Sequence, residues 1–192
     1  MAKDAFHSTG RNDGRLYRAV VCGDRETVIE ELRQGDLDPD LSIGGRTLLH
    51  HAGERGFKEI ARLLIGYGAD QNVTYGKRGR SLLHFAAATG NYGFASVLLE
   101  CEAKPTPRAN NMATPLHFAA RSGQGFLAAL LYNYGAEINA RDTLGRTPLH
   151  LAMAKSHIAL AKQPIGANGN PEIRDRHGNT ARRVAEAMGV EL

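Results

Sequence analysis

Histidine recurs at regular intervals in this chain, at His50, His84, His117 and His150, and could serve as a metal ligand or an acid–base catalyst. A zinc site needs side-chain atoms that converge within about 2 Å of one ion. Equivalent positions on stacked helices, however, lie roughly 8–10 Å apart. These histidines therefore cannot share one metal ion, and we predict that their role is structural and that the chain has no metal site.

Other patterns that could do chemistry are weaker still. The two cysteines, Cys22 and Cys101, have neither the spacing of a metal-ligand set nor a base evident beside them. The basic stretch from Gly76 to Ser81 lacks the GxxxxGK[ST] order that cradles phosphate, and the sequence contains no HExxH or GxSxG. We therefore predict a protein that is not an enzyme and needs no cofactor.

The same histidines mark a repeated unit. Each ends a tetrapeptide (TLLH, SLLH, TPLH, TPLH), and the starts of these tetrapeptides lie 34, 33 and 33 residues apart. An alanine follows two residues after each histidine, and this register reaches back to Ala19 and forward to Ala185. The chain therefore divides into units near 14–46, 47–80, 81–113, 114–146, 147–179 and a partial 180–192. Residues 1–13 precede the first unit and are expected to be a flexible segment.

Each unit predicts two short helices followed by a polar stretch. Thr147 can cap the first helix, and Pro148 suits its first turn, where a missing N–H costs nothing. Leu127, Leu130 and Leu131 have the spacing of one buried stripe on a second helix. The polar stretch that follows, residues 137–146, is too short for another helix. Each unit can bury its apolar faces only against the next, which predicts a stack.

These landmarks resemble the ankyrin repeat over about residues 14–192, with the first and last units degenerate. The resemblance implies an all-α repeat solenoid, in which helix-turn-helix units stack and the polar stretches project as β-hairpin fingers. It implies that the repeated histidine hydrogen-bonds the backbone near the hairpin and ties units together. It also implies a protein–protein interaction module, a scaffold or adaptor, that binds through its fingers and inner helix ends.

Three positions depart from the repeat pattern. Glu102 stands where a glycine would end the helix in the left-handed conformation, at a cost of about 1 kcal/mol. Pro164 falls within the expected second helix of the fifth unit, so this helix should end early and residues 165–170 should form a loose loop. The finger at 71–80 is one residue longer than the others, which we interpret as an insertion that a loop tolerates.

Basic residues gather on the fingers, where acids are few and consist chiefly of Asp142 and Asp175, which the resemblance assigns to turn-bracing hydrogen bonds. Because arginine pairs with carboxylates through two N–H groups, we expect a positive concave edge that binds an acidic segment of a partner protein. The alternative is that these side chains are simply solvated. The predicted partner-binding residues on the fingers are Arg46, Lys77, Arg78, Arg80, Arg108, Arg141, Leu144, Arg146, Arg174 and Arg176, and those at the inner helix ends are Glu54, Arg55, Arg121 and Lys155.

A second function remains open, because the same positive strip could bind nucleic acid or a phosphorylated ligand. The absence of aromatic residues among the finger arginines and the lack of a groove-reading motif argue against it. Asn139, together with Leu131, Glu137 and Ile138, resembles the pattern in which ankyrin-repeat asparagines are hydroxylated by an intracellular oxygenase. The favoured interpretation is that Asn139 only braces the finger turn.

Composition is that of a folded protein, with 42% apolar and 23% charged residues and a net charge of +4. No apolar run approaches the roughly 20 residues that a membrane span needs, and the amino terminus lacks the apolar segment of a secretory signal. We expect a monomer without a membrane span, located inside the cell in the cytoplasm or the nucleus. Both a terminal half repeat and a fragment of a longer protein fit the last unit.

Overall fold

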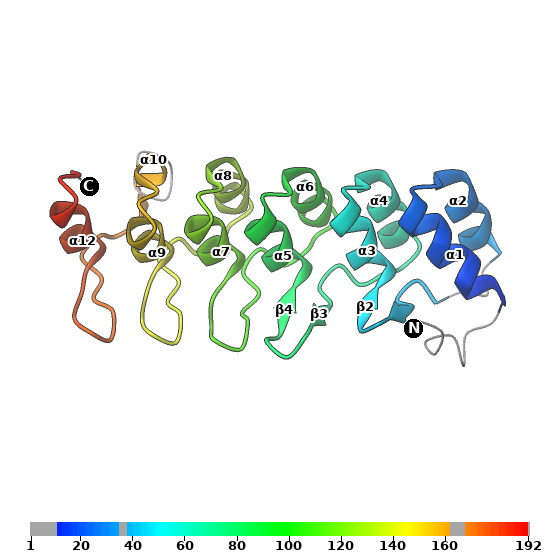
Figure 1. Ribbon diagram of the computed structural model, residues 1–192, viewed down its shortest axis with the longest axis horizontal. Helices are drawn as coiled ribbons and strands as arrows, with labels where there is room; N and C mark the ends of the chain where they lie inside the picture. The colour runs from blue at the N-terminus through cyan, green and yellow to red at the C-terminus, as the bar shows by residue number, and fades with distance from the viewer. Residues whose placement is uncertain (1–10, 35–37, 162–167, 192) are drawn as a thin grey trace, which may run out of the picture.

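The computed structural model describes residues 11–34, 38–161 and 168–191. Pairs of helices follow one another along one axis, and fingers project from the same side of the row (Figure 1). This is the predicted all-α repeat stack. Its elements are, in chain order, α1 (Arg11–Cys22), α2 (Arg25–Arg33), β1 (Ser42–Ile43), β2 (Arg46–Thr47), α3 (Leu48–Arg55), α4 (Lys58–Gly66), β3 (Thr74–Tyr75), β4 (Arg80–Ser81), α5 (Leu82–Thr89), α6 (Tyr92–Glu100), α7 (Pro115–Arg121), α8 (Gly125–Asn133), α9 (Pro148–Ala154), α10 (Ile158–Ala161) and α12 (Ala181–Ala187).

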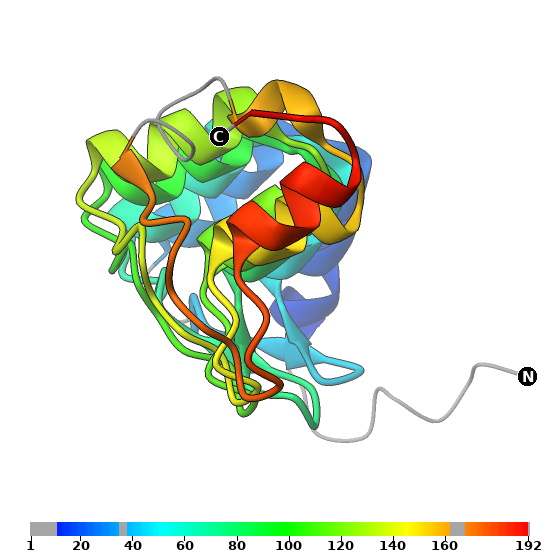
Figure 2. The ribbon, with the colours of Figure 1, turned by 90° about the vertical axis from the view of Figure 1, so that its left-hand side faces the viewer.

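The helices form two layers, which Figure 2 shows end-on with the fingers extending away from both. We call α1, α3, α5, α7, α9 and α12 the inner helices, because each directly follows a finger or begins the stack. The alanines after the repeated histidines, from Ala52 to Ala152, are fully buried on the inner helices. Leu127 and Leu131 of the predicted stripe on α8 are also buried, whereas Leu130 is half-buried. The small residues let neighbouring inner helices approach each other, and the leucines of the outer helices fill the space between neighbouring units.

Each repeated histidine caps its own inner helix. Its Nδ1 accepts the backbone N–H of the threonine or serine three residues earlier, at 3.1 to 3.2 Å. Because this nitrogen accepts, the neutral ring carries its proton on Nε2. That N–H donates to a carbonyl at the end of the finger, from His84 to Ala113 at 2.9 Å, from His117 to Arg146 at 3.0 Å and from His150 to Asn179 at 3.2 Å. The expected tie between helix and hairpin is confirmed for these three.

His50 lacks this second bond. Its side chain is buried, and its Nε2 finds no acceptor among the residues that the structure describes. The finger that follows is the longer one, and the Tyr75 ring from β3 stands edge-on to the imidazole, with centroids 4.5 Å apart. At this one repeated histidine, an aromatic contact with the longer finger stands where the other three have a hydrogen bond.

The inner helices lie farther apart between the second and third units than between the third and fourth. The Phe94 ring of α6 lies so close to Gly53 that any side chain at that position would collide with it. The inner helices α3 and α5 accordingly pack less closely than α5 and α7 do. The buried Phe94 ring thus lies between these two units, where the outer helices α4 and α6 keep their contact.

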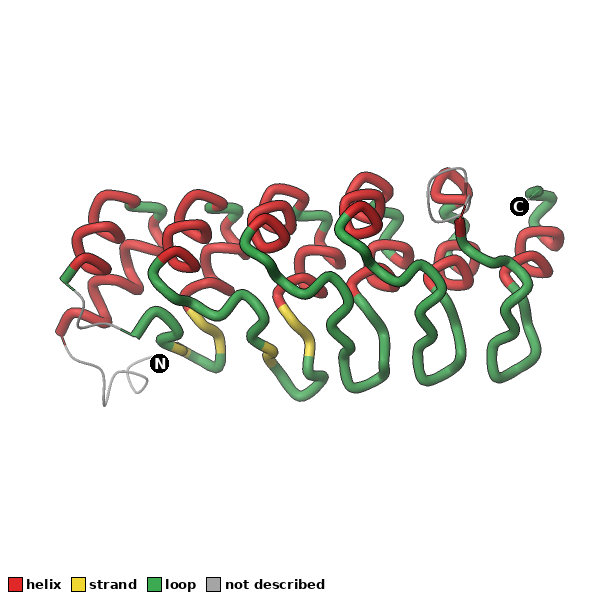
Figure 3. Tube along the Cα trace, turned by 180° about the vertical axis from the view of Figure 1, so that it is seen from behind, coloured by secondary structure: helices red, strands yellow, loops and turns green. Residues whose placement is uncertain are grey.

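Among the residues that the structure describes, paired strands occur only in the first two fingers, as Figure 3 shows. There β1 pairs antiparallel with β2 and β3 with β4. The later fingers keep a hairpin course without such pairs, apart from one isolated bridge between Arg174 and Thr180. Neighbouring tips are joined by backbone hydrogen bonds, among them Asn110 N–H to Arg78 O at 3.0 Å and Arg176 N–H to Leu144 O at 2.9 Å. The fingers therefore form a connected row rather than independent loops.

The remaining expectations about the chain have different outcomes. Glu102 adopts the left-handed conformation with φ 63°, as predicted. The first helix begins at Arg11, three residues before the predicted unit, and residues 1–10 of the expected flexible segment lie outside the described residues. Helix α10 is described over Ile158–Ala161, whereas Pro164 and the first half of the expected loop, residues 165–167, lie outside the described residues.

The two kinds of histidine give a stability prediction. His84→Ala removes both a cap and the bond to the Ala113 carbonyl, whereas His50→Ala removes the cap and an N–H that has no acceptor. We expect His84→Ala to lower the free energy of unfolding by about 1–2 kcal/mol more than His50→Ala does. Urea unfolding of the two variants measures the difference, and equal losses would contradict the structural distinction.

The folded protein should also be less stable at acidic pH. Burial lowers the pKa of His50 and of His84 to about 4, below the ordinary 6.5. Burial likewise lowers the pKa of His117. The unfolded chain therefore binds more protons between pH 6.5 and 4, and the free energy of unfolding must fall as the pH drops through that range.

Urea midpoints at pH 7.5 and pH 5 test this expectation. The midpoint should be lower at pH 5, because most carboxylates are still ionised there and the histidines account for the change. His84→Ala should show a shallower decline than the unmodified protein. A midpoint that does not change between these pH values is incompatible with neutral, buried imidazoles.

Candidate functional site

A groove of about 540 Å³ lies in the angle between the fingers and the inner helices. It extends from the β3–β4 hairpin across the next two fingers to the carboxyl ends of α7 and α9. The structure brings together in this groove six of the residues that the sequence predicts for partner binding, namely Lys77, Arg78, Arg80, Arg121, Arg146 and Lys155.

Local structure explains how these cations come to face one space. Lys77 and Arg78 occupy the turn between β3 and β4, and Arg80 begins β4. Arg121 ends α7, while Lys155 caps the carboxyl end of α9. Basic side chains are favoured at helix carboxyl ends, where the backbone carbonyls carry partial negative charge. One wall of the groove is therefore a finger and the other a row of helix ends.

Arg80 lies over the Phe118 ring, with its guanidinium carbon 4.7 Å from the ring centroid. Phe118 also meets the His84 ring edge-on at 5.2 Å. Such stacking holds the guanidinium flat while leaving its N–H groups available to an acceptor. The ring thus positions a cation as well as forming part of the apolar surface of the groove.

The apolar residues of the groove are Ala113, Phe118, Leu151 and Ala154, and sequence reasoning missed them as functional candidates. We call these four residues the groove floor. A signal was present, because Phe118 and Leu151 each directly follow a repeated histidine, as Phe85 does. Only the structure shows that this position faces the fingers.

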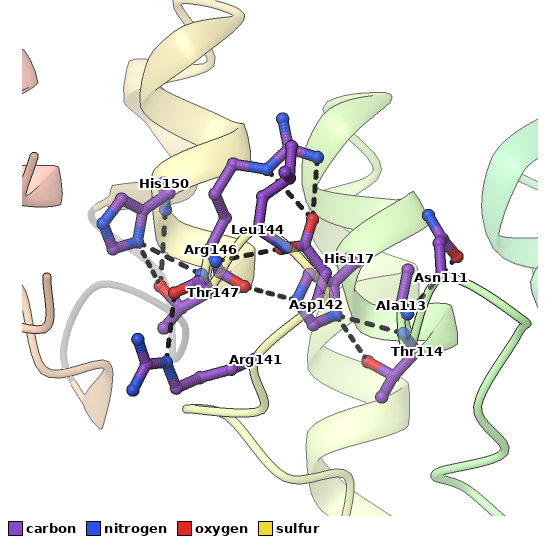
Figure 4. A network of polar contacts seen from close by, with 11 residues as sticks. Asn111, Ala113, Thr114, His117, Arg141, Asp142, Leu144, Arg146, Thr147 and His150 are labelled. Carbon is purple, nitrogen blue, oxygen red and sulfur yellow. Dashed lines mark hydrogen bonds and ion pairs between the residues drawn. The ribbon is translucent and has the colours of Figure 1, made fainter. Parts of the chain in front are cut away.

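Arg146 is already engaged within its own finger, as Figure 4 shows. Its Nε and a terminal nitrogen donate to Asp142 Oδ2 at 2.9 and 2.7 Å. Asp142 Oδ1 accepts the backbone N–H groups of Leu144 and Arg146, both at 2.9 Å. Burial would raise the pKa of the Asp142 carboxyl, but the hydrogen bonds from Arg146 and the amides hold it below its ordinary value. The predicted turn-bracing role of Asp142 is confirmed.

Asp175 braces the last finger in the same way. Its Oδ1 accepts the backbone N–H groups of His177 and Asn179, both at 2.9 Å. The two finger acids singled out from the sequence are therefore both used to shape turns, and they do not extend a free negative charge toward the groove.

The other groove cations are not matched by acids. Within the described part of the chain, Lys77, Arg78, Arg80, Arg121 and Lys155 form no ion pair. Arg80 has the aromatic contact described above, and the remaining four side chains extend into an exposed setting. The groove therefore carries a local excess of positive charge around an apolar floor.

Several predicted residues lie outside the groove and are held by internal contacts. Arg46 pairs with Glu54 at 2.5 Å, and Arg108 pairs with Glu137 at 2.9 Å. Arg141 donates to the carbonyls of Gly145 at 3.2 Å and Arg174 at 2.9 Å. The expected positive strip is thus not uniform, because part of its charge is neutralised or used to link fingers. The predicted residues Arg55, Leu144, Arg174 and Arg176 also lie outside the groove.

Asn139 is exposed, and its Oδ1 accepts the backbone N–H of Asn170 at 2.8 Å. Asn72 accepts the backbone N–H of Lys104 at 2.8 Å in the same manner, two joints of the stack earlier. The side chain therefore braces the start of the next finger, a link between units rather than within one turn. Hydroxylation of Asn139 stays a prediction.

The described residues contain neither a metal-binding cluster nor a membrane-spanning helix. No three histidine, cysteine, aspartate or glutamate side chains there are gathered in a way that could hold a metal ion. Among the same residues, no helix combines the length and apolar character needed to span a membrane.

Stacked helix pairs with laterally projecting fingers define a repeat solenoid. A family profile described as ankyrin repeats in three copies matches residues 16–109 and 107–175. The chain belongs to the ankyrin repeat family, whose repeats are protein–protein interaction modules.

Curated relatives share the repeats but are much longer. The NF-kappa-B inhibitor cactus of Drosophila melanogaster is 38% identical over 81 residues, which are 40% of this chain and 16% of that protein. The ADP-ribosylation factor GTPase-activating protein AGD4 of Arabidopsis thaliana is 36% identical over 103 residues, 54% of this chain and 12% of that protein. The BTB/POZ domain and ankyrin repeat-containing protein BOP of Lupinus luteus is 33% identical over 103 residues, 53% of this chain and 20% of that protein.

Proposed function

We propose that this chain is a non-catalytic interaction module, a scaffold or adaptor, whose groove binds an acidic segment of a partner protein. The observation that carries the proposal is the group of unpaired cations, Lys77, Arg78, Arg80, Arg121 and Lys155, around the groove floor. Membership of the ankyrin repeat family supports a protein as the partner.

Electrostatics supports an acidic ligand. Like charges held close together repel each other, and carboxylates placed among them relieve that repulsion and form charge-assisted hydrogen bonds. Three of the cations are arginines, which pair with carboxylates through two parallel N–H groups. The exposed lysines extend the attraction beyond contact distance and accelerate association at low salt.

The alternative of nucleic acid has less support from the same groove. Binding of single strands relies on bases that stack on aromatic faces. The aromatic ring of the groove floor, Phe118, already has Arg80 over one face and lies edge-on to His84. An acidic protein segment uses the cations without needing that ring face.

Charge reversal in the groove tests the proposal. Peptides displayed as a random library and selected on the protein should be enriched in aspartate and glutamate. We expect the double variant Arg78→Glu/Arg121→Glu to bind a selected fluorescent peptide at least about tenfold more weakly, because like charges then face each other. Arg183→Glu on α12 is the control, since Arg183 is exposed, lies outside the groove and forms no ion pair with any described residue.

Fluorescence anisotropy gives the affinities, and urea unfolding must show that both variants remain folded. Arg141 and Arg146 are less suitable positions, because reversing them would break the bonds that hold their own fingers. Selection of peptides without acidic enrichment, or equal binding by the double variant and the control, would refute the proposal. Tighter binding of a single-stranded oligonucleotide than of every selected peptide would favour the nucleic-acid alternative.

A further inference from the structure

The groove combines positive charge with an apolar surface, and a segment with only acidic residues would use the charge alone. Lys77, Arg78 and Arg80 line its finger wall, and Arg121 and Lys155 line its helix-end wall. The groove floor lies with them in the same cavity; its Ala113 and Leu151 are buried, and its accessible apolar surface comes from Phe118 and Ala154. Phe118 is half-buried and Ala154 is exposed, so part of this apolar surface remains open to a ligand.

A purely acidic peptide would leave that floor in water or cover it with charge. Contact between a carboxylate and an apolar surface is unfavourable, because the charge loses hydration without gaining a partner. An apolar side chain placed on the floor has the opposite effect, since it removes apolar surface from water on both molecules. The volume of about 540 Å³ falls within the range of grooves that bury a substantial part of a small ligand.

We propose that the groove recognises a short segment in which one large apolar residue lies between acidic residues. The apolar side chain packs on the groove floor, and the flanking carboxylates reach the finger wall on one side and the helix-end wall on the other. This inference rests on the proposed function and narrows it from an acidic segment to a defined pattern of side chains. Charge then provides attraction, and the floor selects the residue at the centre.

Three peptides of equal length and equal charge test the pattern. The first has two glutamates on each side of a leucine, the second has alanine in place of the leucine, and the third has the same composition as the first with the leucine moved to one end. We expect the first to bind at least about tenfold more tightly than the second. It should also bind more tightly than the third, because only a central leucine lets acids reach both walls. Equal affinity of all three would overturn the inference.

A variant of the floor separates apolar packing from charge. Ala154→Arg adds a cation to the groove but covers the floor with a long side chain. Ala187→Arg on α12 is the matched control, because Ala187 is also exposed and lies outside the groove. We expect Ala154→Arg to reduce the preference for leucine over alanine to about twofold or less, whereas Ala187→Arg should keep it. A preference that survives Ala154→Arg unchanged would show that the leucine binds elsewhere.

The outcomes distinguish the two levels of the proposal. If acidic peptides bind and Arg78→Glu/Arg121→Glu weakens them, but leucine confers no advantage, the proposed function stands and the pattern is wrong. If no acidic peptide binds the unmodified protein, both are wrong. Isothermal titration calorimetry supplies the affinities for all peptides and variants.

Discussion

A neutral imidazole that accepts on one side and donates on the other fixes the geometry of this stack. The Nδ1 of His117 receives a backbone N–H at the start of α7, and its Nε2–H reaches the carbonyl of Arg146 at 3.0 Å. The ring is rigid and carries its two nitrogens at different edges, so it sets the finger at a defined position relative to the helix. His84 does the same for Ala113. Arg146 and Ala113, whose carbonyls accept these bonds, both line the groove. The geometry of the site therefore depends on the histidine hydrogen bonds.

The fingers divide their charged residues between two tasks. Asp142 is buried and uses one carboxylate oxygen on the turn and the other on Arg146, while Arg141 binds carbonyls of its own finger and of the next. These contacts build a connected row. Five cations whose side chains take no part in these contacts, Lys77, Arg78, Arg80, Arg121 and Lys155, gather where the β3–β4 hairpin faces the ends of α7 and α9. Some charged side chains are thus used in structural contacts while others stay unpaired. The unpaired cations concentrate positive potential in one groove instead of spreading it over the surface.

Much of this could be predicted from the sequence, because a repeat fixes the register of every unit. The residue pattern within each repeat predicts the two helices, and the resemblance to the ankyrin repeat implies the histidine bonds and the approximate position of each finger cation. The left-handed backbone of Glu102 follows from the same register. The groove floor was not predicted, since the sequence does not indicate whether Phe118 and Leu151 face a neighbouring helix or the fingers. Pairings such as Arg108 with Glu137, which lie 29 residues apart, depend on how two fingers approach each other. The missing second bond of His50, whose ring meets Tyr75 instead, was not predicted either.

The central claim is that a partner segment lies in the angle between fingers and inner helices, and chemical-shift mapping tests it most directly. Unlabelled peptide with a central leucine between glutamates is titrated into ¹⁵N-labelled protein at neutral pH. The predicted result is that amide shifts change for residues 77–80, 113–121 and 146–155, while those of α4 and α12 stay in place. Changes confined to the outer helices, with the groove amides unaffected at saturating peptide, would contradict the claim.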